Sequence, residues 1–227
     1  PQSVISGRAP IQLGAELFGC DAIEADSEII SLMLSTFACA GVSRALTLDI
    51  GHIGIYDALF SEVNLDPEIE GQMFDALQRK SAPDIDRLAS SLPDDVSRRL
   101  RQLASLHGSP EVLLEARTLF SDEPVVLAAL DDLDTVLAQA QQAFPDVGVY
   151  VDLTELRGFR YHTGLVFAVY LEGRGSAVAK GGRYDNIGAV FGRDRPATGF
   201  AIDLKALVDD MTPVEASRPP IIAPPSD

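Results

Sequence analysis

The stretch that decides the fold runs from residue 156 to residue 207, LRGFRYHTGLVFAVYLEGRGSAVAKGGRYDNIGAVFGRDRPATGFAIDLKAL. Inside it, the β-forming residues from Leu165 to Leu171 are numerous enough for a central strand. Two glycine-rich segments flank this strand, one ending in Tyr161 and His162 and the other spanning residues 180–185. Glycine permits unusual φ angles and carries no side chain, so both segments are expected to be corners where the backbone approaches a neighbour closely.

The order of the motifs in this stretch is more specific than its glycines. The motifs are RG-x-x-Y, TG-x-VF, GGRYD and P-A-x-GFAI, and a helix is expected from Asp203. This order resembles the histidyl-tRNA synthetase family, which has a class II synthetase fold. The resemblance implies an α/β (α+β) protein with a mostly antiparallel sheet, helices on one face of the sheet and a helical insertion.

A second match lies near the start of the chain. Residues 11–19, IQLGAELFG, resemble the second half of class II motif 2, written Q-x-G-x-E-x-x-G. Residues four apart on a strand share a face, so Gln12 and Glu16 point the same way with Gly14 between them. An acceptor-rich pair over a bare glycine suits an ammonium group, whereas a solvated strand face is the alternative without the resemblance.

The resemblance also implies an amino-acid pocket, with free histidine as its ligand. Glu16 would bind the ammonium group, and Arg157 would bind the carboxylate or form a structural ion pair. Aromatic side chains would wall the pocket. The candidate residues are Gln12, Glu16, Arg157, Tyr161, His162, Tyr184 and Gly199. No metal ligand and no cofactor are expected.

Departures from the synthetase pattern argue against catalysis. In the synthetases, motif 3 reads GFA-x-GLERL, and its arginine grips an ATP phosphate. In this chain Ala206 stands at that arginine position, and Asp203 replaces a glycine and adds a negative charge. Arg160 and His162 likewise stand where the family usually has Asp and Tyr. A triphosphate needs cationic clamps, so no aminoacyl-adenylate chemistry and no catalytic residue are expected.

The YHTG-x-VFA segment is similar to the non-catalytic paralogues of the synthetases, the ATP phosphoribosyltransferase regulatory subunits of histidine biosynthesis. That resemblance implies a partner, the short-form catalytic subunit, whose activity and histidine feedback control would depend on this chain. It also implies self-association as a dimer. Three alternatives remain: a fragment of a histidyl-tRNA synthetase, an amino-acid ligase on the same core, and an interaction module with an empty pocket.

Composition restricts the partners and the compartment. The chain has 34 acidic and 18 basic residues, a formal net charge of −16, which disfavours nucleic-acid binding. No apolar run approaches the length of a membrane span, and no signal-peptide pattern is visible. Cys20 and Cys39 have no metal-site or disulfide spacing and are expected to be small buried residues. A cytoplasmic protein is therefore expected.

The rest of the chain divides by its periodicity. A helix capped by Asp26 is expected to precede a strand that Gly51 and His52 end, and His52 is expected to make a structural hydrogen bond. The clustered Arg98, Arg99 and Arg101 are expected on a solvated helix face. The expected helices between the strands cover about 66–79, 83–90, 93–107, 110–120 and 124–143. The predicted divisions are a core of 1–60 and 144–212 whose N-terminal part is missing, a helical insertion over 61–143, and a Pro-rich linker or C-terminal stub over 213–227.

Overall fold

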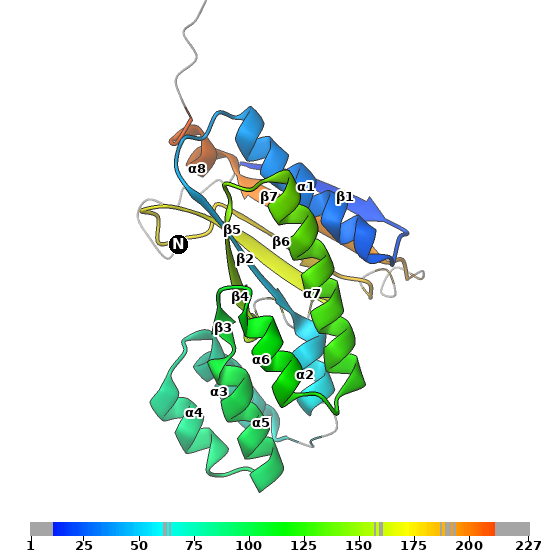
Figure 1. Ribbon diagram of the computed structural model, residues 1–227, viewed down its shortest axis with the longest axis vertical. Helices are drawn as coiled ribbons and strands as arrows, with labels where there is room; N and C mark the ends of the chain where they lie inside the picture. Colours follow the sequence, from blue (N-terminus) through cyan, green and yellow to red (C-terminus); the bar gives the residue numbers. More distant parts are fainter. Residues whose placement is uncertain are drawn as a thin grey trace, which may run out of the picture.

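A seven-stranded sheet organises the computed structural model, in the strand order β1-β7-β6-β5-β2-β4-β3 (Figure 1). The structure describes residues 11–60, 63, 65–156, 158, 161–186, 188, 192 and 194–211. Together with its helices, the sheet makes a mixed α/β fold, as the sequence predicts. Arg157, Arg160 and the segment 213–227 lie outside the described residues.

The sheet is built mainly from antiparallel pairs. At one edge, β1 (Gln12–Phe18) pairs with β7 (Ala197–Asp203), which pairs with β6 (Ala179–Arg183). β6 pairs with β5 (Leu165–Leu171), and β5 with β2 (Leu46–His52). Among the described strands, the parallel pair is β2 with β4 (Gly148–Asp152), and the short β3 (His107–Gly108) closes the other edge. The predicted mostly antiparallel sheet is confirmed.

Two long helices, α1 (Ile23–Cys39) and α7 (Pro124–Ala143), lie side by side across one face of the sheet (Figure 1). The apolar residues of α1 recur at helical spacing, and Met33 and Phe37 have no exposed surface. The short α2 (Ile53–Phe60) follows β2 directly and packs against α7. These contacts bury one face of the sheet and leave its other face for the cavity described below.

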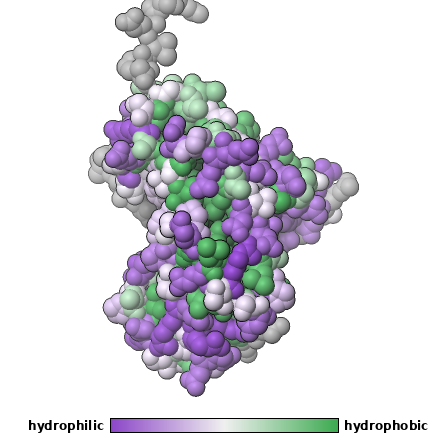
Figure 2. Space-filling view, viewed as in Figure 1, coloured by the Kyte–Doolittle hydropathy of each residue, from purple (hydrophilic) through white to green (hydrophobic). Residues whose placement is uncertain are grey.

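Further helices lie at the end of the sheet that is lowest in Figure 1: α3 (Pro67–Gln78), α4 (Ala82–Ala89), α5 (Asp94–Ser105) and α6 (Val112–Leu119). Hydrophilic side chains cover much of the surface at this end (Figure 2). Arg99 pairs with Glu123 at 2.5 Å, and Arg101 pairs with Asp86 at 3.0 Å. These arginines are therefore engaged with neighbouring carboxylates. The division into a core and an insertion over 61–143 stays a prediction.

The structure corrects several local expectations. α1 begins at Ile23 with Ala22 as its N-cap, and Asp26 is fully buried inside the helix. β2 ends at His52, as expected, whereas the helix expected over 93–107 stops at Ser105, two residues before β3 begins. Cys39 is exposed rather than buried, because it lies in the last turn of α1.

The glycines of the 180–185 segment are also placed differently from the expectation. Gly181 and Gly182 lie inside β6 and do not form a corner. A Cβ on Gly182 would lie 2.7 Å from both His162 Nδ1 and the carbonyl oxygen of Leu165. These glycines therefore allow close contacts across a continuous strand.

No helix among the described residues is long and apolar enough to cross a bilayer.

Candidate functional site

A cavity of about 420 Å³ is formed over β1, β7, β6 and β5 and the segment that precedes β5. Pairing across the strands aligns Glu16, Gly199, Gly182 and Val166 in one row, so these residues share a face of the sheet. All four line the cavity. Five of the seven predicted site residues lie around it: Glu16, Tyr161, His162, Tyr184 and Gly199.

The row is kept open by glycine. A Cβ on Gly199 would overlap the carboxylate of Glu16 and would come within 2.8 Å of the Ala15 carbonyl oxygen. Glu16 therefore lies across the bare backbone of β7. The two motif residues depend on each other, because the side chain of Glu16 occupies the space that a side chain at position 199 would need.

Glu16 is held by an aromatic wall. The Tyr184 hydroxyl donates a hydrogen bond to Glu16 Oε2, and the Tyr184 ring lies 5.0 Å from that of Tyr161. Partial burial raises the pKa of Glu16 above its usual value, and burial together with the Glu16 charge raises that of Tyr161. A cationic group entering the cavity would relieve this unfavourable environment of the Glu16 carboxylate.

His162 continues the same wall edge-on to Tyr161, with ring centroids 5.1 Å apart. Its Nδ1 lies 3.2 Å from the carbonyl oxygen of Arg183, which assigns the ring hydrogen to Nδ1 and leaves Nε2 as an acceptor. Burial lowers the pKa of His162, opposed by that hydrogen bond and by the charge of Glu155. The imidazole is therefore neutral at pH 7.

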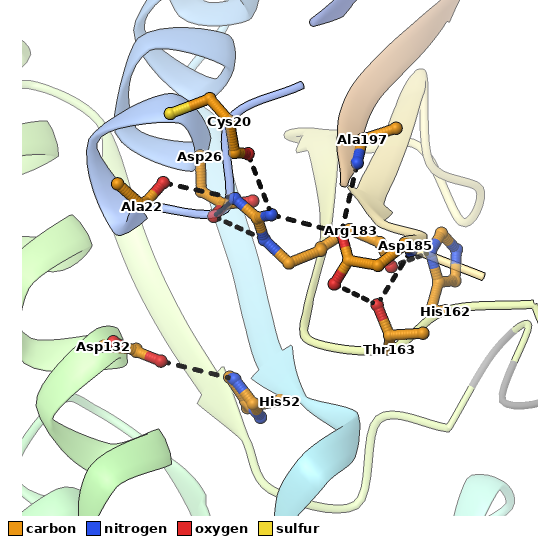
Figure 3. A network of polar contacts seen from close by, with 10 residues as sticks. All are labelled: Cys20, Ala22, Asp26, His52, Asp132, His162, Thr163, Arg183, Asp185 and Ala197. Carbon is orange, nitrogen blue, oxygen red and sulfur yellow. Dashed lines mark hydrogen bonds and ion pairs between the residues drawn. The ribbon is translucent and has the colours of Figure 1, made fainter. Parts of the chain in front are cut away.

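Behind the cavity, Arg183 ties β6 to α1 (Figure 3). Its Nε and a terminal nitrogen donate to Asp26 Oδ2 at 2.9 and 2.5 Å, and another terminal nitrogen donates to Asp185 Oδ1 at 3.2 Å. Two carbonyl oxygens, those of Cys20 and Ala22, accept further bonds from the same guanidinium. Burial alone would lower the pKa of Arg183, but the bonds and charges of Asp26 and Asp185 raise it above its usual value.

Asp185 carries this network to the cavity wall. Its carboxylate accepts from the Thr163 hydroxyl at 2.9 Å and from the Ala197 backbone N–H at 3.1 Å (Figure 3). Thr163 directly follows His162, and Ala197 begins β7. The network therefore fixes two segments that line the cavity relative to α1.

His52 lies on the same side of the sheet as this network. The backbone N–H of Gly54 donates to His52 Nδ1 at 3.1 Å, and His52 Nε2 lies 3.7 Å from Asp132 of α7 (Figure 3). The expected structural hydrogen bond is thus present. Burial, and then the positive charge of Arg183, lower the pKa of His52 to about 4. His52 is neutral at physiological pH.

The other two predicted site residues do not line the described cavity. Gln12 shares a face with Glu16 but pairs with Asp203 at the far end of β7, about 13 Å along the strand. Arg157 lies outside the described residues. The sequence reasoning missed Glu155 and Lys180, which both line the cavity. Recognising β6 as a strand would have placed Lys180 on the face of Gly182, two residues away.

The segment that matches motif 3 ends in a short helix, α8 (Leu204–Val208). The Asp203 carboxylate caps it, accepting from the backbone N–H groups of Lys205 at 3.0 Å and Ala206 at 3.2 Å. Ala206 is half-buried and packs against the hydrophobic core. In the described structure, therefore, Asp203 caps α8 and Ala206 contributes to packing.

The cavity combines two carboxylates, one lysine and the aromatic rings of Tyr161, His162 and Tyr184. Such a lining suits a small ligand with an ammonium group and a flat side chain. Within the described residues no cluster of His, Cys, Asp and Glu has the arrangement of a metal site. Together, the mostly antiparallel sheet, the helices on one face and the ligand-sized cavity on the other define a protein of the class II aminoacyl-tRNA synthetase type.

Comparison with known proteins identifies the family within this class. The sequence profile of histidyl-tRNA synthetase matches residues 1–207, and the chain belongs to this family. It is 50% identical over 209 residues to a protein from Pseudomonas entomophila named ATP phosphoribosyltransferase regulatory subunit, and 50% identical over 210 residues to one of the same name from Marinobacter nauticus. These matches cover 92% of this chain but 53% of each relative, so the chain spans about half the length of these curated relatives.

Solved structures agree with the fold. A Bacillus halodurans protein described as an ATP phosphoribosyltransferase regulatory subunit/histidyl-tRNA synthetase matches with a TM-score of 0.77 and 31% identity, over 90% of this chain and 54% of that one. A chain of the ATP phosphoribosyl transferase (HisG:HisZ) complex from Thermotoga maritima matches with a TM-score of 0.67 and 23% identity, over 87% of this chain and 68% of that one. The second likeness concerns the fold alone.

Proposed function

We propose that this chain is the synthetase-like core of a non-catalytic regulatory subunit of ATP phosphoribosyltransferase, acting in the first step of histidine biosynthesis. The observation that carries the proposal is the identity of about one half, over 92% of the chain, to proteins bearing that name. The alternative, a fragment of a histidyl-tRNA synthetase, requires the chemistry of histidine activation.

The motif 3 segment supports the regulatory function over that alternative. Asp203 and Ala206 stand where the synthetases have a glycine and the arginine that grips ATP. The carboxylate of Asp203 is engaged with the N-terminus of α8, and Ala206 packs on the core. A triphosphate at this position would meet an anion and would lack a guanidinium clamp.

The cavity is the proposed site of histidine binding. Glu16 would bind the ammonium group, while Tyr161, His162 and Tyr184 would enclose the imidazole. Arg157 and Gln12 stay predicted members of this site, with Arg157 either as a partner of the carboxylate or in a structural ion pair. A neutral His162 supports this assignment, because its free Nε2 can accept a hydrogen bond from the ligand.

The proposed partner is the short-form catalytic subunit of ATP phosphoribosyltransferase, with self-association of this chain's protein as a dimer. Relatives that are 50% identical over 92% of the chain are named as regulatory subunits of this enzyme, which supports the proposal. We further propose a cytoplasmic protein that binds neither nucleic acid nor membrane, with the core of 1–60 and 144–212 and the helical insertion of 61–143 as its units. Occupancy of the histidine site would be communicated to the partner.

The first test is histidine-dependent exchange between pyrophosphate and ATP by the complete protein. We expect no exchange, because the motif 3 arginine is replaced by Ala206 and Asp203 adds a negative charge. Replacing Ala206 by Arg alone should not create activity, since Asp203 remains. Exchange at rates typical of a synthetase would support the histidyl-tRNA synthetase alternative and contradict the regulatory proposal.

A further inference from the structure

Lys180 has no evident structural reason for its position on β6. It lies in an interior strand of the sheet, between Ala201 of β7 and Ala168 of β5, and its side chain is exposed. Lysine is depleted in strands because it gains little from packing on a sheet, and alanine neighbours give its long side chain few contacts. Its presence is better explained by a ligand than by folding.

Lys180 also makes no ion pair within the described part of the chain. The nearest carboxylate in its own row is that of Asp49 on β2, two strands away, at a backbone separation of about 10 Å. The row continues in the other direction through Ala201 to Gly14. The neighbours of Lys180 in this row are therefore alanine on both adjacent strands and glycine on β1.

The position of Lys180 relative to Glu16 suits a zwitterion. Lys180 pairs with Ala201, which pairs with Gly14, two residues before Glu16 on β1. Two strand spacings and two residue steps separate the Cα atoms of Lys180 and Glu16 by roughly 12 Å. Both side chains line the same cavity, one anionic and one cationic, with the aromatic wall beside Glu16.

We propose that Lys180 binds the carboxylate of the amino acid whose ammonium group binds Glu16, and that it makes the cavity selective for a free α-carboxylate. This inference rests on the proposed histidine site and adds a determinant of its selectivity. Without Lys180, the remaining charged side chains described around the cavity are Glu16 and Glu155, both acidic. Around the cavity, none of these described side chains would then favour histidine over its amine or its amide.

Calorimetric titration of the complete protein with L-histidine and with L-histidinamide, which has no carboxylate, tests the proposal. The parent should bind histidine at least tenfold more tightly than histidinamide. Lys180→Met should weaken histidine binding at least tenfold, equivalent to about 1.4 kcal/mol, and should leave histidinamide binding within about twofold. Lys180→Arg should preserve the preference, and Lys205→Met, which removes the same charge outside the cavity, should behave as the parent.

The results that would overturn the proposal are distinct. Unchanged selectivity in a folded Lys180→Met protein would remove Lys180 from the site, and so would a loss of selectivity in Arg157→Met alone. If Lys180→Met lost the binding of phosphate or ATP in the same calorimetric titrations while histidine binding stayed intact, Lys180 would be a phosphate contact instead. If the parent binds no histidine, both the proposed histidine site and this inference are wrong. Assembly with the catalytic subunit can still be measured separately. If Lys180→Met does not fold, Lys180→Gln takes its place with the same expected loss.

Discussion

Replacing Arg183 by Met should destabilise the protein more than any change at an exposed arginine. The substitution removes five hydrogen bonds and leaves Asp26, a residue with 0% exposure, as a buried carboxylate without its cation. Breaking a buried ion pair from one side typically costs about 3–5 kcal/mol. A domain of ordinary stability has about 5–15 kcal/mol in total, so the loss should be a large share.

Urea unfolding followed by circular dichroism measures this effect. The matched control is Arg101→Met, because Arg101 pairs with Asp86 at 3.0 Å while both side chains are 43% and 68% exposed. Such an exposed pair is worth about 0–1 kcal/mol. Adding Asp26→Asn to Arg183→Met should recover part of the loss, since the uncompensated charge disappears. If Arg183→Met costs no more than Arg101→Met, the network does not anchor the cavity to α1.

Two further predictions concern the cavity and the pH dependence of stability. Glu16→Gln should weaken histidine binding at least tenfold in calorimetry, equivalent to about 1.4 kcal/mol, because the ammonium group of histidine would lose its anionic partner. Unchanged affinity would move the histidine site elsewhere. The pKa of His52 is about 4 in the folded protein, against 6.5 in the unfolded chain. Between these two pH values only the unfolded state takes up the His52 proton. The free energy of unfolding should therefore decrease as the pH falls from 6.5 to 4, by up to about 3 kcal/mol. The free energy of unfolding measured across this range should fall less steeply in His52→Gln, and identical slopes would refute a neutral buried His52.

Strands of the sheet are predictable from the sequence where a run of β-forming residues is long enough to indicate a strand by itself. Leu165 to Leu171 is apolar throughout and forms β5 within the bounds expected. For Gly181 and Gly182 the sequence alone predicts a corner, because paired glycines usually mark turns. The fold explains the glycines inside β6: a Cβ on Gly182 would meet His162 and the Leu165 carbonyl oxygen, and one on Gly181 would meet the Gly199 carbonyl oxygen and the Phe167 ring.

The site was predictable only as far as the motifs extend. Glu16, Tyr161, His162, Tyr184 and Gly199 were found through the resemblance, and all five line the cavity. Gln12 was expected beside them because it shares a face with Glu16, but a four-residue step moves it about 13 Å along the strand.

The partnership of Asp26 and Arg183 was hidden from the sequence. An aspartate early in a helix has the pattern of an N-cap, and its cation lies 157 positions further along the chain. A pair of such separation is formed by the fold and leaves no local pattern. Lys180 was missed for a related reason, since its face is defined only once β6 is known to be a strand.

Reconstitution with the short-form catalytic subunit tests the central claim most directly. The complete protein and the short subunit are mixed, and formation of phosphoribosyl-ATP from ATP and phosphoribosyl pyrophosphate is measured with and without histidine. The proposal predicts that turnover requires this protein and that histidine inhibits the mixture, through a coupling of about 1–3 kcal/mol between the two sites. A short subunit that is equally active and equally insensitive to histidine with and without this protein would contradict the account.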